Sequence, residues 1–256
     1  MTIRPGIELA NLSDVGLHRS DNEDYYCYVE PENDEEFLRK GRLVVVADGM
    51  GGQAGGQIAS TIAVESVRDV YFSHASADPL EALMAGFAAG HAAIQEYAQQ
   101  HPELAGMGTT CTAVVLLDGQ LFYGHVGDSR LYLIRDGAIS QLSQDHSRVA
   151  RLVREGAITP EEAAGHPDRN VLTAALGMAS PGHGDLPGDF PQAPVPLESG
   201  DILLICTDGL HGLVSDEEMR LAASAHPPRE ACLELVNLAK DRGGFDNITL
   251  QIVLVN

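Results

Sequence analysis

The sequence predicts an α+β fold, a four-layer α-β-β-α sandwich in which two mainly antiparallel sheets are flanked by helices. Short runs rich in β-branched residues occur along the whole chain, and Asp-Gly pairs lie between or beside several of them. Such pairs favour tight hairpin turns. Helical periodicity is confined to a few longer segments. Because sheets that are apolar on both faces need covering, these helices should form the two outer layers.

Six apolar runs are predicted to be strands: residues 43–47, 112–117, 121–126, 131–134, 202–206 and 248–255. The pairs Asp118-Gly119 and Asp136-Gly137 are expected to turn the chain in hairpins. Strands joined by short hairpins run in opposite directions, so the sheets should be largely antiparallel. The segment from Gly177 to Pro196 is rich in Gly and Pro, and we expect a loop there.

Helices are predicted from apolar spacing or from capping signatures in five places: residues 59–70, residues 80–94, residues 230–240, and the segments that follow Thr159 and Ser215. The second of these opens with Asp78-Pro79, a capping residue followed by proline at the first helical position. Thr159 and Ser215 each precede a glutamate by three residues, which is the spacing of a capping box.

Composition limits the classes of partner. The chain has 256 residues, 44% of them hydrophobic, and we expect one domain spanning residues 1–256. Lys and Arg number 16 against 37 Asp and Glu, a net charge of −21. This balance argues against nucleic acid or an anionic membrane as partner. The four cysteines are far apart, which disfavours a zinc site or a redox dithiol. We expect a cytoplasmic protein, monomeric by default, without a spanning helix or signal peptide.

Four aspartates lie at the ends of apolar runs, each beside glycine or a small polar residue: Asp48, Asp128, Asp208 and Asp246. Aspartate is a poor strand former, and a strand end beside a turn lets a side chain point into a shared site. Converging carboxylates repel one another unless a hard cation lies between them, and Mg²⁺ or Mn²⁺ suits oxygen ligands. The pattern therefore predicts a metal centre held by carboxylates.

The motifs around these aspartates resemble those of bacterial metal-dependent serine/threonine protein phosphatases of the type-2C (PPM) family, nearly from end to end. Seven elements occur in the family's order: Asp14-x-Gly16 with Arg19-Ser20-Asp21-Asn22-Glu23-Asp24, Ala47-Asp48-Gly49-Met50-Gly51-Gly52, Gly108-Thr109-Thr110, Gly124-His125-Val126-Gly127-Asp128-Ser129-Arg130, Asp145-His146-Ser147, Thr207-Asp208-Gly209-Leu210, and Asp246-Asn247-Ile248-Thr249. A single Asp-Gly pair indicates only a turn, whereas seven ordered elements are specific.

The resemblance implies two Mn²⁺ or Mg²⁺ ions at the site. Asp48 matches the ligand that bridges them, and the Gly49 carbonyl matches a ligand of the first ion. Asp208 and Asp246 match ligands of the second ion. A hydroxide generated between the ions would attack phosphorus in line, so no phosphoenzyme would form.

Three further acidic residues receive supporting roles from the resemblance. Asp128, together with Asp208, matches a weaker third metal site of bacterial members. Glu23 and Asp24 match residues that hold metal-bound water or support the ligands.

Arg19 matches the residue that binds the substrate phosphate, and its planar guanidinium fits two phosphate oxygens. The alternative is a surface arginine paired with Asp21 or Glu23; because cations are few in so acidic a site, we favour the phosphate role. Met50 stands where eukaryotic relatives place a histidine proposed as general acid. A metal-bound water is then the preferred proton donor.

Other residues near these motifs are expected to be structural. Arg130 should form an internal ion pair that fixes its turn, and His146 should support the fold. His166 and His211 are expected in loops, as solvated residues near the mouth of the site.

Residues of about 147–170 resemble the family's flap, a small helical excursion beside the site. This segment and its edge carry four arginines: Arg148, Arg151, Arg154 and Arg169. They could collect acidic phosphopeptides or pair with Glu155, Glu161 and Glu162, and the sequence favours neither interpretation. Ala174 stands where the family commonly has an arginine, which bears on flap anchoring or substrate preference.

The resulting hypothesis is a phosphatase that acts on phosphoserine and phosphothreonine in proteins, opposing a bacterial Ser/Thr kinase in signalling. Phosphorylated proteins, including such a kinase or its substrates, would be its partners. Two alternatives stay open: a pseudophosphatase that binds phosphoproteins without turnover, and a hydrolase of small phosphoesters. The first predicts a missing ligand, and every ligand position is filled.

Overall fold

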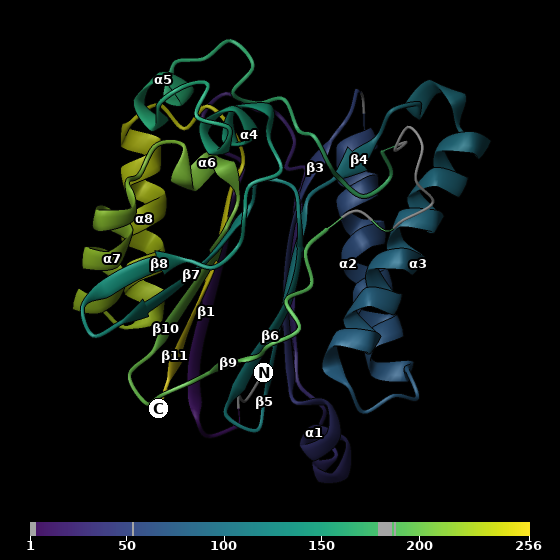
Figure 1. Cartoon of the computed structure of the whole chain (residues 1–256), viewed down its shortest axis with the longest axis vertical. Coiled ribbons are helices and arrows are strands. Elements are labelled where there is room, and N and C mark those ends of the chain that lie inside the picture. Colours follow the sequence, from purple (N-terminus) through teal and green to yellow (C-terminus); the bar gives the residue numbers. More distant parts are fainter. Residues whose placement is uncertain (1–3, 53, 179–185, 187) are drawn as a thin grey trace.

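Two antiparallel sheets pack face to face between outer layers of helices in the computed structural model, which describes residues 4–52, 54–178, 186 and 188–256 (Figure 1). This arrangement confirms the predicted α-β-β-α sandwich. None of the helices in this part of the chain combines the length and apolar character needed to cross a membrane.

The first sheet has five strands in the order β1-β11-β10-β7-β8, and all its pairs are antiparallel. Its strands are β1 (Ile7–Asp14), β7 (Arg130–Arg135), β8 (Ala138–Gln141), β10 (Ile202–Cys206) and β11 (Ile248–Val255). Strand β11 therefore lies inside the sheet, between the first strand of the chain and β10.

The second sheet follows the order β2-β3-β5-β6-β9, with the short strand β4 paired to the end of β3. Its strands are β2 (Asp24–Val29), β3 (Arg42–Met50), β4 (Gly108–Thr109), β5 (Cys111–Leu117), β6 (Gln120–Val126) and β9 (Val195–Pro196). Asp118 and Gly119 turn the chain from β5 to β6 with φ angles of 50° and 67°. Two successive positive φ angles are what a tight hairpin requires.

All six predicted strands are present, whereas β1, β2, β4, β8 and β9 were not predicted. Strands β1 and β2 are only partly buried and mix polar with apolar residues, so they lack a continuous apolar run. The prediction of loop for residues 177–196 is wrong at β9, where Val195 and Pro196 pair with β6. Residues 179–185 and 187 lie outside the described residues.

Helices α2 (Gly55–Ser73) and α3 (Pro79–Gln100) cover the second sheet, and α7 (Asp216–Ala225) and α8 (Pro228–Asp241) cover the first (Figure 1). The shorter helices are α1 (Asp34–Lys40), α4 (Arg148–Arg154), α5 (Pro160–Ala164), α6 (Asp208–His211) and a 3₁₀ turn at Pro102–Leu104. Both predicted capping boxes form, at Thr159 and Ser215. The predicted helices are thus confirmed, and α1 and α6 are additional.

Alternation along β3 explains how the fold positions its aspartate. Val44 and Val46 pack in the core between the two sheets, while Val45 and Ala47 pack under helices α2 and α3. Successive side chains of a strand point to opposite faces. Asp48 continues the series of Val44 and Val46, so it belongs to the face that looks across at the other sheet.

Candidate metal centre

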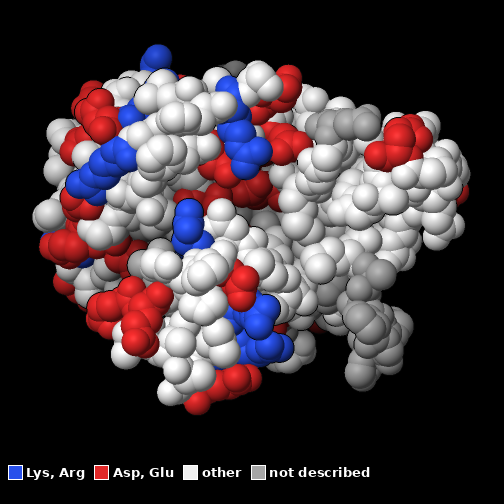
Figure 2. All heavy atoms as spheres, turned by 90° about the horizontal axis from the view of Figure 1, so that it is seen from above, with Lys and Arg blue, Asp and Glu red and all other residues white. Residues whose placement is uncertain are grey.

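Carboxylates from five segments meet at one end of the gap between the sheets. Asp48 and Asp24 are register partners on β3 and β2. Asp208 is the first residue of α6 directly after β10, Asp246 precedes β11, and Asp128 lies in the turn between β6 and β7. Figure 2 looks onto this end and shows acidic atoms at the floor of a hollow, with separate basic side chains around it.

Burial and mutual repulsion dominate the electrostatics of this cluster. Burial, followed by the charge of neighbouring carboxylates, raises the pKa of Asp208 to about 6, of Asp24 to about 7 and of Asp128 to about 8. The same two causes raise the pKa of Asp48 well above its usual value, with Asp24 and Asp208 as the strongest neighbours. The ionised cluster therefore lacks compensating positive charge.

One oxygen of Asp24 identifies what the cluster lacks. Its Oδ2 accepts a hydrogen bond from Thr207 Oγ1 at 3.0 Å, whereas its Oδ1 is buried without any hydrogen-bond partner among the described residues. A buried carboxylate oxygen without a partner is costly. An all-oxygen donor set with excess negative charge fits hard divalent cations.

The side chains of the described residues do not enclose an ion by themselves. Within the described part of the chain, no three His, Cys, Asp or Glu side chains group closely enough to hold an ion between them. Two neighbouring ions can share carboxylates and complete their coordination with water and backbone carbonyls. Such a pair does not require a closed set of side chains around each ion.

The Gly108-Thr109-Thr110 motif fixes the backbone of Asp48. The Asp48 N–H donates to Thr110 Oγ1 at 2.8 Å, and Thr109 Oγ1 donates to the Asp48 carbonyl at 2.8 Å. Thr110 Oγ1 also lies 2.8 Å from Ser129 Oγ, beside Asp128. The sequence predicted the importance of this motif but not its anchoring role. Two adjacent threonines at the entry to a strand are the signal that could have indicated that role.

The glycine after Asp48 allows a close approach of backbones. The Gly49 N–H donates to the Glu23 carbonyl at 3.2 Å. A side chain at Gly49 would collide with the Gly56 carbonyl at the start of α2, and one at Gly56 would collide with the Glu23 carboxylate. Burial raises the pKa of Glu23, which lies at the edge of the cluster. The structure thus brings Glu23 and Gly49 together beside Asp48.

Asn247 holds the segment of Asp246 against the N-terminal loop. Its Nδ2 donates to the carbonyls of Val15 at 2.9 Å and Asp21 at 3.0 Å, and its Oδ1 accepts from the Glu23 N–H at 2.8 Å. We did not predict this role, although the Asp-Asn pair before a strand was part of the quoted motif. Asn247 therefore orients two segments of the candidate site at once, that of Asp246 and that of Glu23.

Arg19 contacts the cluster directly. Its Nη2 donates to Asp246 Oδ2 at 2.8 Å, and its Nη1 lies 3.9 Å from Glu23 Oε2. Asp21, the other partner considered, accepts from Ser20 Oγ at 2.7 Å. The hydrogen bond to Asp246 is the largest cause that raises the pKa of Arg19. With 47% of its side chain exposed, Arg19 can also meet a ligand from solvent.

Two residues support the Asp128 turn. Arg130 forms an ion pair with Asp145, with Nη2 2.7 Å from Oδ2, which confirms its predicted structural role. His211 was expected in a loop, and that prediction is wrong: it ends helix α6, is half-buried, and its Nε2 lies 2.9 Å from the Asp128 carbonyl. Burial lowers the pKa of His211 to about 4. A short helix directly after β10 brings this ring inward.

The two remaining histidines have separate surroundings. His146 Nδ1 accepts from the Gly127 N–H at 3.1 Å, and its Nε2 lies 3.1 Å from Asp189 Oδ2, which confirms a fold-supporting position. His166 is half-buried in a turn, where its Nδ1 accepts from the Asp168 N–H at 3.1 Å.

Helices α4 and α5 lie within residues 147–170, the segment for which a flap is predicted. Beside them is a cavity of about 310 Å³ lined by Asp128, Asp208, Arg169 and Asn170 among others. The other three arginines have partners: Arg148 pairs with Asp168 at 3.2 Å, Arg151 with Glu155 at 3.8 Å, and Arg154 donates to the Asp145 carbonyl at 3.1 Å. Of the three acidic partners proposed, only Glu155 pairs with an arginine within the described residues; Glu162 caps α5 instead.

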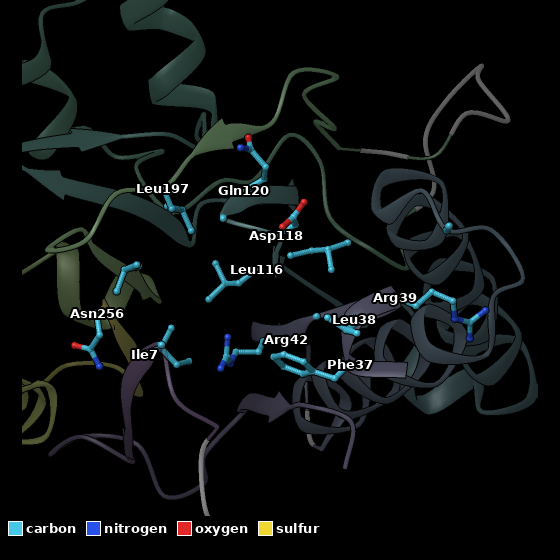
Figure 3. A pocket seen from close by; sticks show the side chains of 16 residues that line it. Ile7, Phe37, Leu38, Arg39, Arg42, Leu116, Asp118, Gln120, Leu197 and Asn256 are labelled. Atoms are coloured by element: carbon cyan, nitrogen blue, oxygen red, sulfur yellow. The ribbon is translucent and has the colours of Figure 1, made fainter. Parts of the chain in front are cut away.

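A larger cavity lies elsewhere in the described structure. It has a volume of about 750 Å³ and is lined by Ile7, Phe37, Leu38, Arg42 and Leu197 among others (Figure 3). Ile7 begins β1 and Arg42 begins β3, whereas Asp48 lies near the end of β3. This cavity is therefore at the opposite end of the sandwich from the carboxylates.

Comparisons with known proteins identify the family of this chain. A family model described as protein phosphatase 2C matches residues 30–234. The protein phosphatase PhpP of Streptococcus pneumoniae is 37% identical over 256 residues, covering 98% of each chain. The serine/threonine protein phosphatase PstP of Mycobacterium tuberculosis is 37% identical over 246 residues, which cover 96% of this chain but 44% of PstP.

A solved structure carries the same architecture together with metal. The crystal structure of the catalytic domain of the serine/threonine protein phosphatase PstP in complex with two manganese ions has a TM-score of 0.82 and 35% identity, with 98% of both chains covered. The chain belongs to the protein phosphatase 2C family.

Proposed function

We propose that this member of the family removes phosphate from phosphoserine and phosphothreonine in proteins, with Mn²⁺ or Mg²⁺ as its cofactor and two ions at the site. The observation that carries the proposal is the cluster formed by the buried Asp24 and the half-buried Asp48, Asp128 and Asp208. Their raised pKa values and the unpartnered Asp24 Oδ1 call for divalent cations at this place. The names of PhpP and PstP support the substrate class.

Different aspartates of this chain would hold the different ions. Asp48 lies at the centre, since burial and then the charges of four carboxylates raise its pKa, those of Asp24, Asp208, Asp128 and Asp246. We assign it the bridging role, with the Gly49 carbonyl beside it. Asp208 and Asp246 would hold the second ion, and Asp128 with Asp208 a weaker third. Two bound ions would supply a hydroxide nucleophile at neutral pH and neutralise charge on the phosphoryl group, so the reaction needs no phosphoenzyme.

Arg19 would bind the substrate phosphate. Its guanidinium already contacts Asp246 and is half exposed, so it can turn one N–H pair outward without leaving the cluster. A planar guanidinium can donate two parallel hydrogen bonds to phosphate oxygens. Glu23 and Asp24 would support the site: Glu23 lies next to Arg19, and Asp24 lies beside Asp48 on the neighbouring strand.

The test is phosphate release from a phosphothreonine peptide, with Mn²⁺ and separately Mg²⁺ titrated into fully chelated protein. We expect turnover to appear with metal and to vanish in Asp48→Ala. Asp136→Asn, in an exposed turn between β7 and β8, is the matched control and should behave as wild type.

The alternatives give different outcomes in the same assay. Metal binding without turnover of any phosphoester would contradict the proposal and support a phosphoprotein-binding module. Faster turnover of small aryl phosphates and nucleotides than of phosphopeptides, compared as kcat/KM at matched metal, would support a hydrolase of small phosphoesters instead.

A further inference from the structure

Exposed apolar side chains gather beside Arg19. In the described structure, nine large apolar side chains are more than a third exposed, and three of them, Val15, Leu17 and Phe245, come from the two loops that carry Arg19 and Asp246. Leu17 and Phe245 are each 59% exposed. Exposed apolar residues scattered singly need no explanation, but a group of them at the rim of a site does.

Contacts between the two loops hold these side chains in place. The Leu17 N–H donates to the Gly244 carbonyl at 2.8 Å. The Leu17 side chain also lies close to Gly244, since a Cβ added at Gly244 would stand 3.1 Å from Leu17 Cγ. The Phe245 ring folds back over Gly243, where a side chain would collide with it. His18 lies against the same ring, with centroids 5.1 Å apart. We call Leu17, His18 and Phe245 the apolar lip.

The lip borders the place where phosphate would bind. His18 directly precedes Arg19, Phe245 directly precedes Asp246, and Arg19 Nη2 lies 2.8 Å from Asp246 Oδ2. Both loops are anchored from behind: the Lys240 Nζ lies 2.8 Å from Asp14 Oδ2, and Asn247 bonds to the Val15 carbonyl. The lip is therefore a preformed surface next to the reacting group.

We propose that the lip binds an apolar side chain that lies one or two residues from the phosphorylated Ser or Thr of the substrate. The proposal rests on the phosphatase function proposed above and names the substrate feature that this chain selects. In an extended peptide, neighbouring residues are about 3.3 Å apart along the chain, so such a side chain can reach a surface adjoining Arg19. A polar or charged side chain at that position would gain no apolar contact with the lip.

The experiment compares phosphothreonine peptides that differ at one position, with Leu or the similarly shaped Asn placed in turn at each of the two positions on either side. The readout is the ratio of kcat/KM for the Leu peptide to that for the Asn peptide, measured with saturating Mn²⁺. We expect a ratio of about ten at one or two positions in the wild type, the range seen when an apolar group fills or leaves a pocket. In Phe245→Ala the ratio should fall to about two or less.

Two further variants make the result decisive. Leu17→Ala should lower the ratio to an intermediate value, and it keeps the proposal testable if Phe245→Ala folds poorly. Leu233→Ala removes a 47% exposed leucine from α8 and should keep the wild-type ratio. Because the readout is a ratio, a general loss of activity from a shifted Asp246 cancels.

The possible failures separate the two proposals. Metal-dependent turnover with a ratio near one at every position, or a ratio that both lip variants leave unchanged, would overturn the lip and leave the phosphatase function standing. Absence of metal-dependent turnover on every peptide would overturn the phosphatase function, and the lip with it.

Discussion

The two ends of the sandwich bury charge in opposite ways. At the end away from the carboxylate cluster, which we call the far end, Arg42 pairs with Glu30 at 3.1 Å and lies 4.9 Å from the Phe37 ring, beside a cavity of about 750 Å³ (Figure 3). At the end that carries the cluster, the near end, Asp48 and Asp24 stand side by side, and one oxygen of Asp24 has no partner among the described residues. The cavity at the far end is therefore larger than the one of about 310 Å³ beside Asp128 and Asp208, although its buried charges are paired.

One strand shows the contrast within nine residues. Strand β3 begins with Arg42, whose charge is balanced, and carries Asp48 near its other end, whose pKa is raised by burial and by neighbouring carboxylates. Uncompensated buried charge is kept where it serves binding or catalysis, since it costs stability. Charge balance thus distinguishes the two ends better than volume does.

The largest expected effect comes from removing a charge at the near end. Asp208→Asn keeps the shape of a candidate ligand but removes its charge, so we expect turnover of a phosphothreonine peptide to fall by about 10³-fold or more because metal binding weakens. Steady-state kinetics with Mn²⁺ titrated to saturation measures it. Activity within tenfold of wild type at saturation would refute the assignment of Asp208.

Metal should stabilise the near end and leave the far end unaffected. At 100 times its dissociation constant, Mn²⁺ is expected to add about 2.7 kcal/mol, which raises the melting temperature of a domain this large by roughly 5–10 °C. Asp48→Asn should lose most of this gain.

Glu30→Gln is the matched change at the far end. It leaves Arg42 buried without its charge partner, so the variant should melt at a lower temperature but keep the full Mn²⁺ shift. Thermal denaturation with and without metal distinguishes the two variants. Equal Mn²⁺ shifts in wild type and Asp48→Asn would contradict the metal centre.

Acid should destabilise the near end through His125. Burial lowers the pKa of this histidine to about 4, helped by the charge of His146 and opposed by Asp145 and Asp189. An unfolded histidine titrates near ~6.5, so between these values the unfolded state binds the extra proton. This contribution to stability is complete above pH ~6.5 and is lost as the pH falls to ~4, by up to about 3 kcal/mol.

The check is the free energy of unfolding against pH for wild type and His125→Gln. The ring nitrogens contact Thr112 Oγ1 at 2.9 Å and the Gly127 carbonyl at 3.1 Å, and an amide can also form hydrogen bonds there without titrating. The variant should show a flatter acid limb. Parallel curves would assign the acid sensitivity to other groups.

The smallest expected effect is the change in kcat/KM when one of two arginines is replaced. Arg19→Ala should lower kcat/KM for a phosphopeptide by roughly 10–100-fold, because a hydrogen bond to a charged group contributes about 1.5–3 kcal/mol. Arg39→Ala changes an exposed arginine that lines the far cavity and should leave kcat/KM unchanged. Equal losses in the two variants would show that both arginines act only through overall charge.

The sequence predicted those elements that depend on residues close together in the chain, namely buried strands and helix caps. Strand β10 is buried on both faces and is a continuous apolar run, and β11 is nearly so, interrupted by Thr249 and Gln251. The caps at Thr159 and Ser215 act within four residues. The four aspartates were found for the same reason, since each ends or begins such a run. Edge strand β1 was missed because its pattern is only partly apolar.

Contacts that depend on sheet register could not be predicted. The bond between Thr110 and Ser129 joins residues 19 apart, and Asn247 bonds to residues 224 to 232 positions away. Nothing local distinguishes these hydroxyls and amides from solvated ones. The inward position of His211 and the partner of Arg148 depend in the same way on where neighbouring segments pack.

The position of β11 sets when during synthesis the carboxylate cluster can be completed. This strand lies between β1 and β10, and Ser13 is joined to Thr249 by a 2.7 Å hydrogen bond across 236 residues. The first sheet, and with it the place of Asp246, cannot be completed until residues near 255 have left the ribosome. A growing chain therefore carries Asp48 and Asp208 for some time before β11 can join the sheet, and we expect no activity from a fragment that ends before β11.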